Sequence, residues 1–426
     1  MGRFTPRNRH LLAMSLMLSF CAVYIQTSFG SSFHQEEDKL MNGKEPDIEL
    51  KEPQEEFSFE GGSFRIWRTD VSAFSDKRID VTEITFEEDG LLLPQYADAD
   101  GIAYVIQGTG KLGIVTYFEG LPIAKIRRVE PGHIVSIPKG SVFWWYNDGY
   151  GMHRIFCASD TVEGTDPGLY HQFTLAGAKA KRFGGLLHGF STAALASVWN
   201  VDEDTVRHFL ENQNSTSFVK SPRRIKLPDP RWISCDTQAE TKPRNNMQIA
   251  EFTYNMNSKY PDFSVRSGGW KKEVDDGSLP VLQKVGMSAS MVGLEPNAME
   301  APLFFSNANQ LVYILNGSGR LEVSSSNGET LLAREVRPGM IFAIPKFLPS
   351  IKVAGDTGLS FLTLLTSSRP HCSYLIGMSS PYENVPKQVM AEALNIDESS
   401  LSELLANRKH DHIIFPPADI MVERKH

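Results

Sequence analysis

The stretch that decides the fold is IAYVIQGTGKL at residues 102–112, because it returns as LVYILNGSGRL at residues 311–321. A second pair follows in the same order. VEPGHIVSIPK at 129–139 returns as VRPGMIFAIPK at 336–346. Self-similarity in a fixed order is the signature of a repeated architecture. The sequence therefore predicts a tandem duplication, with one copy of the same fold in each half.

Each half is a series of short Val, Ile, Tyr and Phe runs separated by Gly, Pro and Asn-Asp signals. This spacing is typical of antiparallel strands in a barrel or sandwich. Gly108 and Gly317 end the apolar run within each copy of the first repeated stretch, and we expect each to supply a positive φ at a hairpin turn. The Pro-Gly pairs at 131–132 and 338–339 should open a turn into the next strand. The fold class predicted is mainly β, with two tandem barrels.

A short helical segment is expected after each barrel, marked by a third repeated pair, NVDE at 200–203 and NIDE at 395–398. Residues 192–199 are rich in Ala and Leu and predict a helix. Asp202 and Asp397 are expected to cap the helices that follow, where negative charge suits the helix dipole. These apolar faces could pack on their own barrel or on a neighbouring subunit, and the sequence leaves both alternatives open. The apolar positions at helical spacing are Val206, Phe209 and Leu210 in the first half and Leu401, Leu404 and Leu405 in the second.

The N-terminus has the features of a secretory signal peptide. Arg3, Arg7 and Arg9 precede an apolar run that begins at Leu11, and small residues follow it. The run is shorter than the roughly 20 residues needed to cross a bilayer. We therefore expect a signal peptide at 1–30, an oxidising secretory compartment and no membrane anchor.

The 426 residues suggest two or three domains of ordinary size. The expected organisation is a signal peptide at 1–30, a polar disordered lead-in at 31–56, an N-terminal barrel with helices at 57–220, a Pro-rich linker at 221–246, a C-terminal barrel with helices at 247–417, and a tail at 418–426.

Charge and cysteine content exclude several classes of function. The formal net charge is −8, which argues against a nucleic-acid partner because that would need a basic face. Of four cysteines, Cys21 leaves with the signal peptide. Cys157 lies in an apolar run and is expected to be a buried thiol, whereas the pairing of Cys235 and Cys372 stays open.

Several motifs resemble a known family. The Pro-Gly-x5-Pro-x-Gly pattern at 131–140 is similar to the second cupin motif, and FWWYNDG at 143–149 resembles a legumin-type pattern. GFST at 189–192, NVDEDT at 200–205 and YILNG at 313–317 match further legumin stretches. The chain therefore resembles the legumin-type (11S) seed storage globulins, which are bicupins.

The resemblance runs from about Phe59 to Pro417. It implies two jelly-roll cupin barrels, assembly with itself as a homotrimer or hexamer, and storage in vacuolar bodies for later proteolysis. Storage legumins are cut after an Asn-Gly between their halves, with a Cys shortly after. Here Asn245 and Asn246 take that place without a following Cys, so they are candidate sites for an asparagine-specific processing protease.

The resemblance also allows a test for metal chemistry. Catalytic cupins hold Mn, Fe or Zn with three His and one Glu, donors that suit these ions. Alignment on Gly108 and Gly317 gives eight candidate ligand positions, and none is a His or a carboxylate. We therefore expect no metal, no other cofactor and no enzymatic activity. The eight positions are Pro94, Tyr96, Gly101 and Phe143 in the first barrel and Leu303, Phe305, Gln310 and Ser350 in the second.

The emptied pockets leave a second set of candidate residues. Tyr96, Phe143, Trp145 and Phe305 are the expected pocket-lining side chains. The aromatic cluster at 143–146 either fills the barrel as core or forms a stacking floor for a sugar or other ligand.

Smaller features complete the expectations. His133 is expected to be structural. Asn214 is the expected N-glycosylation site, because the sequon at Asn316 falls in a predicted barrel turn.

The function expected is a non-enzymatic nutrient reservoir, a seed or spore storage globulin-like protein in the protein-storage vacuole or outside the cell. The alternatives are sugar-type small-molecule binding, a defence-related cupin and, least favoured, a metal-dependent oxidase. No nucleic-acid or membrane partner is expected.

Overall fold

The computed structural model describes residues 48–69, 74, 78–118, 121–227, 251–378, 380–406 and 413–417. Several expectations fall outside these ranges, namely the signal peptide at 1–30, the lead-in up to residue 47, Cys21, Cys235, Asn245, Asn246 and the tail at 418–426.

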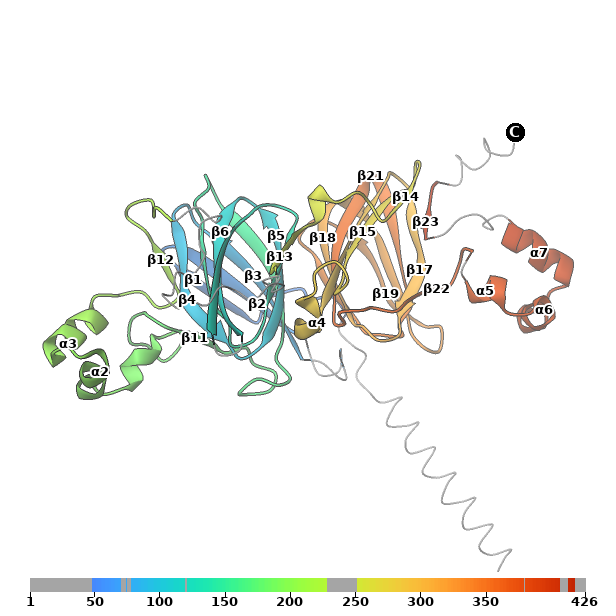
Figure 1. Cartoon of the computed structure of the whole chain (residues 1–426). Helices are drawn as coiled ribbons and strands as arrows, with labels where there is room; N and C mark the ends of the chain where they lie inside the picture. Colours follow the sequence, from blue (N-terminus) through green and yellow to red (C-terminus); the bar gives the residue numbers. More distant parts are fainter. Residues whose placement is uncertain are drawn as a thin grey trace, which may run out of the picture. The chain divides into compact units, whose positions relative to one another are not determined.

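The first half folds into a barrel of antiparallel strands (Figure 1). Its strands are β1 Glu55–Phe59, β2 Gly62–Arg68, β3 Ile79–Phe86, β4 Gly90–Ala97, β5 Asp100–Gln107, β6 Gly110–Phe118, β7 Leu121–Val129, β8 His133–Ile137, β9 Val142–Tyr146, β10 His153–Asp160, β11 Gln172–Thr174, β12 Phe218–Lys220 and β13 Thr253–Asn255. One sheet has the order β1-β2-β3-β10-β5-β8-β13, and the other has β11-β4-β9-β6-β7 with β12 paired to β4.

The second half repeats this architecture. Its strands are β14 Phe263–Val265, β15 Gly269–Val274, β16 Ser288–Leu294, β17 Met299–Phe305, β18 Gln310–Ser324, β19 Thr330–Val336, β20 Ile341–Ile344, β21 Ser350–Leu365, β22 Cys372–Tyr374 and β23 Ile414–Phe415. The main path is β14-β15-β16-β21-β17-β22, and β18 pairs with β19, β20 and β21. The predicted fold class of two tandem jelly-roll barrels is confirmed.

The repeated glycines have the predicted backbone conformation but not the predicted role. Gly108 has φ 73° and Gly317 has φ 82°, the left-handed region that glycine enters without strain. The prediction of a hairpin turn is wrong, because β5 and β6 do not pair with each other. Strand β5 pairs with β8 and β10, and β6 pairs with β7 and β9. In the second barrel Gly317 and Asn316 lie inside the continuous strand β18, at a register shift. Gly108 therefore lies at a bend between β5 and β6, whereas Gly317 lies within a strand.

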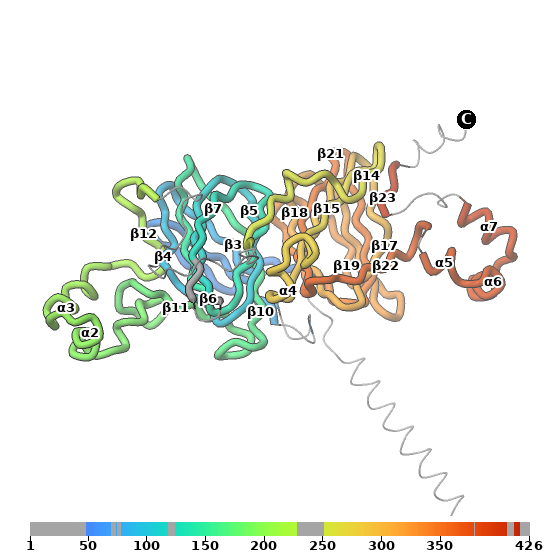
Figure 2. Tube along the Cα trace, viewed as in Figure 1, coloured from blue at the N-terminus to red at the C-terminus, as the bar shows by residue number. Residues whose placement is uncertain are grey.

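The helical extensions follow each barrel as predicted. Their bounds are η1 Leu186–Gly189, α2 Thr192–Trp199 and α3 Glu203–Glu211 in the first half, and α5 Pro381–Asn384, α6 Lys387–Leu394 and α7 Glu398–Ala406 in the second; shorter pieces are η3 Met256–Ser258 and α4 Leu282–Val285. In Figure 2 the traces of α2 and α3 form a helical hairpin, whose own small core contains Leu195, Ala196 and Val206.

The repeated Asn-x-Asp-Glu sequence explains this hairpin. Asn200 and Asn395 end the first helix of each pair in the left-handed conformation, with φ 55° and 52°, a conformation that asparagine tolerates better than most residues. The side chain of Asp202 accepts a hydrogen bond from Thr205 N at 2.7 Å, and Asp397 accepts one from Ser400 N at 2.9 Å. Both predicted caps are confirmed.

The expected borders of the lead-in and of the second domain need correction. Ile48 is buried, Glu49 forms a β-bridge with Phe342, and Leu50 N donates to Ile341 O at 3.0 Å. Residues 48–50 are therefore not a solvated lead-in, and the first strand, β1, already begins at Glu55. In the same way β13, expected in the second domain, pairs with β8 of the first barrel. The repeated strands β8 and β20 thus each receive a segment from the other half, because both offer an open edge.

The start of the expected linker also lies on the first barrel. Ser221 N donates to Asp89 O at 3.0 Å, and Ile225 N donates to the hydroxyl of Tyr146 at 3.1 Å. Among the helices that the structure describes, none is long and apolar enough to cross a membrane.

Candidate functional site

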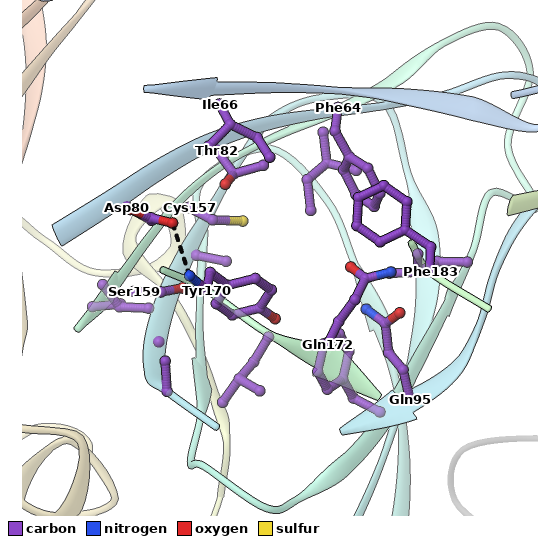
Figure 3. Close-up of a pocket in the computed structure, with 18 of the residues that line it drawn as sticks. Phe64, Ile66, Asp80, Thr82, Gln95, Cys157, Ser159, Tyr170, Gln172 and Phe183 are labelled. Carbon is purple, nitrogen blue, oxygen red and sulfur yellow. Dashed lines mark hydrogen bonds between the residues drawn. The ribbon is translucent and has the colours of Figure 1, made fainter. Parts of the chain in front are cut away.

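The interior of the first barrel contains a cavity of about 60 Å³ (Figure 3). Strands from both sheets line it, and the loop after β11 contributes Arg182 and Phe183. Its polar lining residues are Arg68, Asp80, Thr82, Gln95, Cys157, Ser159, Tyr170, Gln172 and Arg182, and its aromatic ones include Phe64, Phe143 and Phe183.

A β-bulge decides which residues of β4 face this cavity. Leu92 lies opposite Trp145 and Gln95 opposite Phe143, so three steps on β4 match two on β9. One extra residue turns the following side chains to the other face. The alignment that placed Pro94 and Tyr96 at ligand positions was therefore wrong, and Gln95 lines the cavity instead.

The other pocket predictions have mixed outcomes. Gly101 and Phe143 line the cavity. Tyr96 faces away from it and stacks on Phe173, with ring centroids 4.8 Å apart. Phe305 lies in the second barrel, where it packs in a cluster with Leu303.

Trp145 is a core residue. Its side chain is 2% exposed, and its Nε1 donates to His153 Nε2 at 2.8 Å. His153 Nδ1 in turn donates to Gln107 O at 2.9 Å, which fixes the neutral tautomer. Of the two interpretations of the aromatic cluster, the core one is correct for Trp145, so Trp145 offers no stacking floor for a sugar. The sequence analysis missed His153, and the Trp-x7-His spacing was too unspecific to point to it.

His153 gives the fold a predictable sensitivity to acid. Burial lowers the pKa of His153 from 6.5 to about 4. As the pH falls, His153 therefore binds a proton in the unfolded chain before it does so in the folded one. The contribution of neutral His153 to stability is complete above pH 6.5 and is lost progressively down to about pH 4. The difference corresponds to about 3 kcal/mol at most. Asp80 acts in the opposite direction, because burial raises its pKa from 3.8 to about 6, which favours folding as the pH falls through that window.

We expect wild-type protein to lose about 2 kcal/mol more stability than His153→Gln between pH 7 and pH 4.5. Glutamine can still donate to Gln107 O but does not titrate, so the Asp80 contribution is common to both proteins. Urea unfolding at the two pH values measures the difference. Equal losses in both proteins would contradict this role of His153.

The charges around the cavity are compensated. Arg68 donates to Glu55 at 3.0 Å and lies 3.8 Å from Asp80, and Arg182 also pairs with Glu55. The hydrogen bond from Arg182 holds the pKa of Glu55 below its usual value. Asp80 additionally accepts a hydrogen bond from Tyr170 N at 3.1 Å (Figure 3). The lining therefore carries ionised groups that already have partners of opposite charge.

Two thiols are free in the described part of the chain, Cys157 and Cys372. Burial raises the pKa of Cys157 to about 12, so this thiol stays protonated near neutral pH. Thiolate, not thiol, is the nucleophile. Cys157, expected to be buried, lines the cavity without the chemistry of a reactive cysteine.

The interior of the second barrel contains charged side chains that lie outside the eight candidate ligand positions. Glu300 and Lys352 form an ion pair of 2.9 Å, with 4% and 3% of their side chains exposed. Lys271, also buried, donates to the hydroxyl of Tyr374 at 2.9 Å. The sequence analysis considered only four positions there, Leu303, Phe305, Gln310 and Ser350. It missed these charges because Glu and Lys are rarely buried without a partner.

These two interiors do not fit a cupin metal. At or near the ligand positions lie amides, aromatics, aliphatics and one carboxylate, Glu300, which is already paired with the ammonium of Lys352. Within the ranges that the structure describes, no three His, Cys, Asp or Glu side chains gather closely enough to hold an ion.

The chain belongs to the cupin family, whose model matches residues 48–181 and 254–401. Two curated relatives cover nearly all of it: cocosin 1 of Cocos nucifera is 25% identical over 96% of this chain and 97% of the relative, and 11S globulin seed storage protein 2 of Sesamum indicum is 24% identical over 96% and 98%. The resemblance to legumin-type globulins is thereby confirmed, and the chain is a legumin-type bicupin.

Solved structures agree with this fold. The crystal structure of the coconut allergen cocosin has a TM-score of 0.77 at 24% identity, covering 87% of this chain and 98% of that one. The 11S globulin from Wrightia tinctoria, whose structure is described as revealing an auxin binding site, has a TM-score of 0.77 at 25% identity, covering 88% and 97%.

Proposed function

We propose that this protein is a non-enzymatic nutrient reservoir of the 11S type. The observation that carries the proposal is the end-to-end match with seed storage globulins, which spans 96% of this chain and 97% and 98% of two such relatives. The side chains inside the barrels support it, because Gln95 and Phe143 line the cavity of the first barrel, and the buried carboxylate of Glu300 in the second barrel is already paired with Lys352.

The reservoir role is tested by abundance through the life cycle. We expect the protein to be among the most abundant in a storage tissue and to disappear when growth resumes, as measured by quantitative mass spectrometry of extracts over time. A low, constant level in growing tissue would contradict the proposal.

The proposed route to this store is the secretory pathway, ending in the protein-storage vacuole or outside the cell, with cleavage after Asn245 or Asn246 by an asparagine-specific protease. N-terminal sequencing of the protein purified from mature tissue tests whether this cleavage occurs. A new N-terminus at residue 246 or 247 supports processing there. A single uncut chain would contradict it.

Asn214 is the proposed glycosylation site, since its side chain is exposed just after α3. Expressed in a secretory cell, the wild type should carry one glycan that the Asn214→Gln variant lacks, seen as a mass difference before and after glycosidase treatment. Asn316→Gln is the control and should retain the glycan, because Asn316 lies within β18. Loss of the glycan only in Asn316→Gln would overturn the assignment.

The proposed assembly is a homotrimer in which the helices of one chain contact those of the next. Only the small hairpin core of α2 and α3 is covered by the chain itself, while Val198, Trp199 and Phe209 stay exposed. In the second half Val389 and Leu404 are exposed on α6 and α7. This exposure favours the neighbouring-subunit alternative. Head-to-tail contacts between two different faces close into a ring, and a hexamer would pair two such rings.

A further inference from the structure

We propose that the first barrel binds a small uncharged molecule that has an apolar body and one hydroxyl group, and that this hydroxyl donates to Gln95 Oε1. This proposal is independent of the reservoir role. It stands on an unpaired acceptor, on compensated charges and on an aromatic side chain that closes the cavity.

The unpaired acceptor is the first observation. Gln95 is 2% exposed, and its Oε1 has no hydrogen-bond partner. Figure 3 shows its amide directed into the cavity next to Gln172. A buried polar atom without a partner destabilises the fold, and such atoms are rare. The bulge in β4 turns the Gln95 side chain toward the cavity, so its amide lies there because of the strand geometry. A donor inside the cavity would satisfy it.

The charged residues that line the cavity determine which net charge a ligand with such a donor can carry. Arg68 lies between Glu55 and Asp80, and Arg182 pairs with Glu55. Arg68 Nε is buried without a hydrogen bond, and the oxygen of a neutral hydroxyl can accept from it without breaking either ion pair. An anionic ligand would in addition meet the carboxylates of Glu55 and Asp80 beside Arg68. The remaining polar neighbours, Thr82 and Ser159 among them, are themselves uncharged. The cavity therefore favours an uncharged ligand.

The apolar wall and the volume define the body of the ligand. Phe64 and Phe143 line the cavity together with aliphatic residues of β4 and β5. The volume of about 60 Å³ offers room for roughly four to six water molecules. A single small ring with a hydroxyl group is the largest body that we propose, and phenol is the simplest probe. Because a cavity that holds benzene measures about 150 Å³, phenol enters only if Phe183 moves outward.

Phe183 closes the cavity at a conformational cost. Its φ is 59°, an outlier for a bulky residue. Strained residues of this kind concentrate at ligand sites, because the surrounding structure must hold them in place. Here Phe57 and Phe64 hold the ring, with centroids 5.0 and 5.9 Å away. Figure 3 shows the rings of Phe64 and Phe183 together on one side of the cavity.

The test compares the affinities of phenol and toluene by calorimetry on the full mature chain. We expect the ratio of phenol affinity to toluene affinity to fall about fivefold in Gln95→Leu, the loss expected for one hydrogen bond. Gln310→Leu is the matched control, since Gln310 is also buried with an unpaired side-chain atom but lies in the second barrel. The ratio should stay unchanged in this control.

Three results would overturn the proposal: an unchanged ratio in Gln95→Leu, wild-type protein that binds no phenol, and benzoate that binds more tightly than phenol at pH 7. If Gln95→Leu does not fold, nuclear Overhauser effects between phenol and the wild-type protein locate the binding site instead. Contacts from the phenol ring to Phe64 and Phe183 support the site. Contacts to residues outside the first barrel contradict it.

Discussion

Replacing Glu300 with alanine is expected to lower the free energy of unfolding by about 3–5 kcal/mol. Glu300 on β17 and Lys352 on β21 are cross-strand neighbours, and their charged atoms are 2.9 Å apart in the interior of the second barrel. Without the carboxylate, the buried ammonium of Lys352 retains a hydrogen bond of 3.4 Å to the hydroxyl of Ser350. A neutral hydroxyl cannot replace a counter-charge in a buried site, so the cost is large. Chemical denaturation followed by circular dichroism measures it.

Two controls separate this effect from simple truncation. Glu322→Ala removes one side of a surface pair with Arg320, where both side chains are 46% exposed, and should cost less than about 1 kcal/mol. Glu300→Leu combined with Lys352→Met removes both charges and should recover most of the loss, because apolar residues can replace a buried pair. A Glu300→Ala protein as stable as the wild type would show that the pair does not stabilise the barrel.

The second large effect concerns assembly. Val198→Glu on α2 or Leu404→Glu on α7 should each convert the proposed trimer to monomer at micromolar concentration. Val198 is 79% exposed and Leu404 58% exposed in the single chain, so each can contact a neighbour. An unpaired carboxylate buried in an apolar contact costs several kcal/mol, which weakens association about a hundredfold or more. Tyr260→Glu, at an exposed site outside the helices, is the control and should remain trimeric.

A mixing experiment tests the head-to-tail arrangement. The Val198→Glu chain keeps an intact α6–α7 face, and the Leu404→Glu chain keeps an intact α2–α3 face. An equal mixture should therefore form a heterodimer, in which the intact α6–α7 face of one chain contacts the intact α2–α3 face of the other. This heterodimer cannot close into a ring. If each face instead paired with its own copy, either variant alone would form a dimer, which light scattering would detect.

Much of the fold could be predicted because the duplication shows each signal twice. The repeated Asn-x-Asp-Glu sequence predicted both helix pairs and both caps, since Asn200 and Asp202 act through local backbone geometry alone. The glycine φ values were predictable for the same reason. The place of Gly108 in the sheets could not be predicted, because strand pairing depends on partners far along the chain.

The interiors of the barrels were harder to predict. The bulge at Gln95 inserts one residue into β4, and a single inserted residue reverses which side chains face inward. A spacing rule taken from Gly108 cannot detect it. The Glu300–Lys352 pair was missed because each residue alone resembles a surface residue, and only the register of β17 and β21 brings them together. Ile48 and Leu50 did carry an alternating apolar signal, but it was too short to stand out in a polar segment.

The mass of the native particle tests the central claim, that two barrels with exposed helical faces assemble into closed rings. Light scattering coupled to size exclusion should give three times the mass of the mature chain, or six times if rings pair. A particle with the mass of a single chain at micromolar concentration would contradict the account.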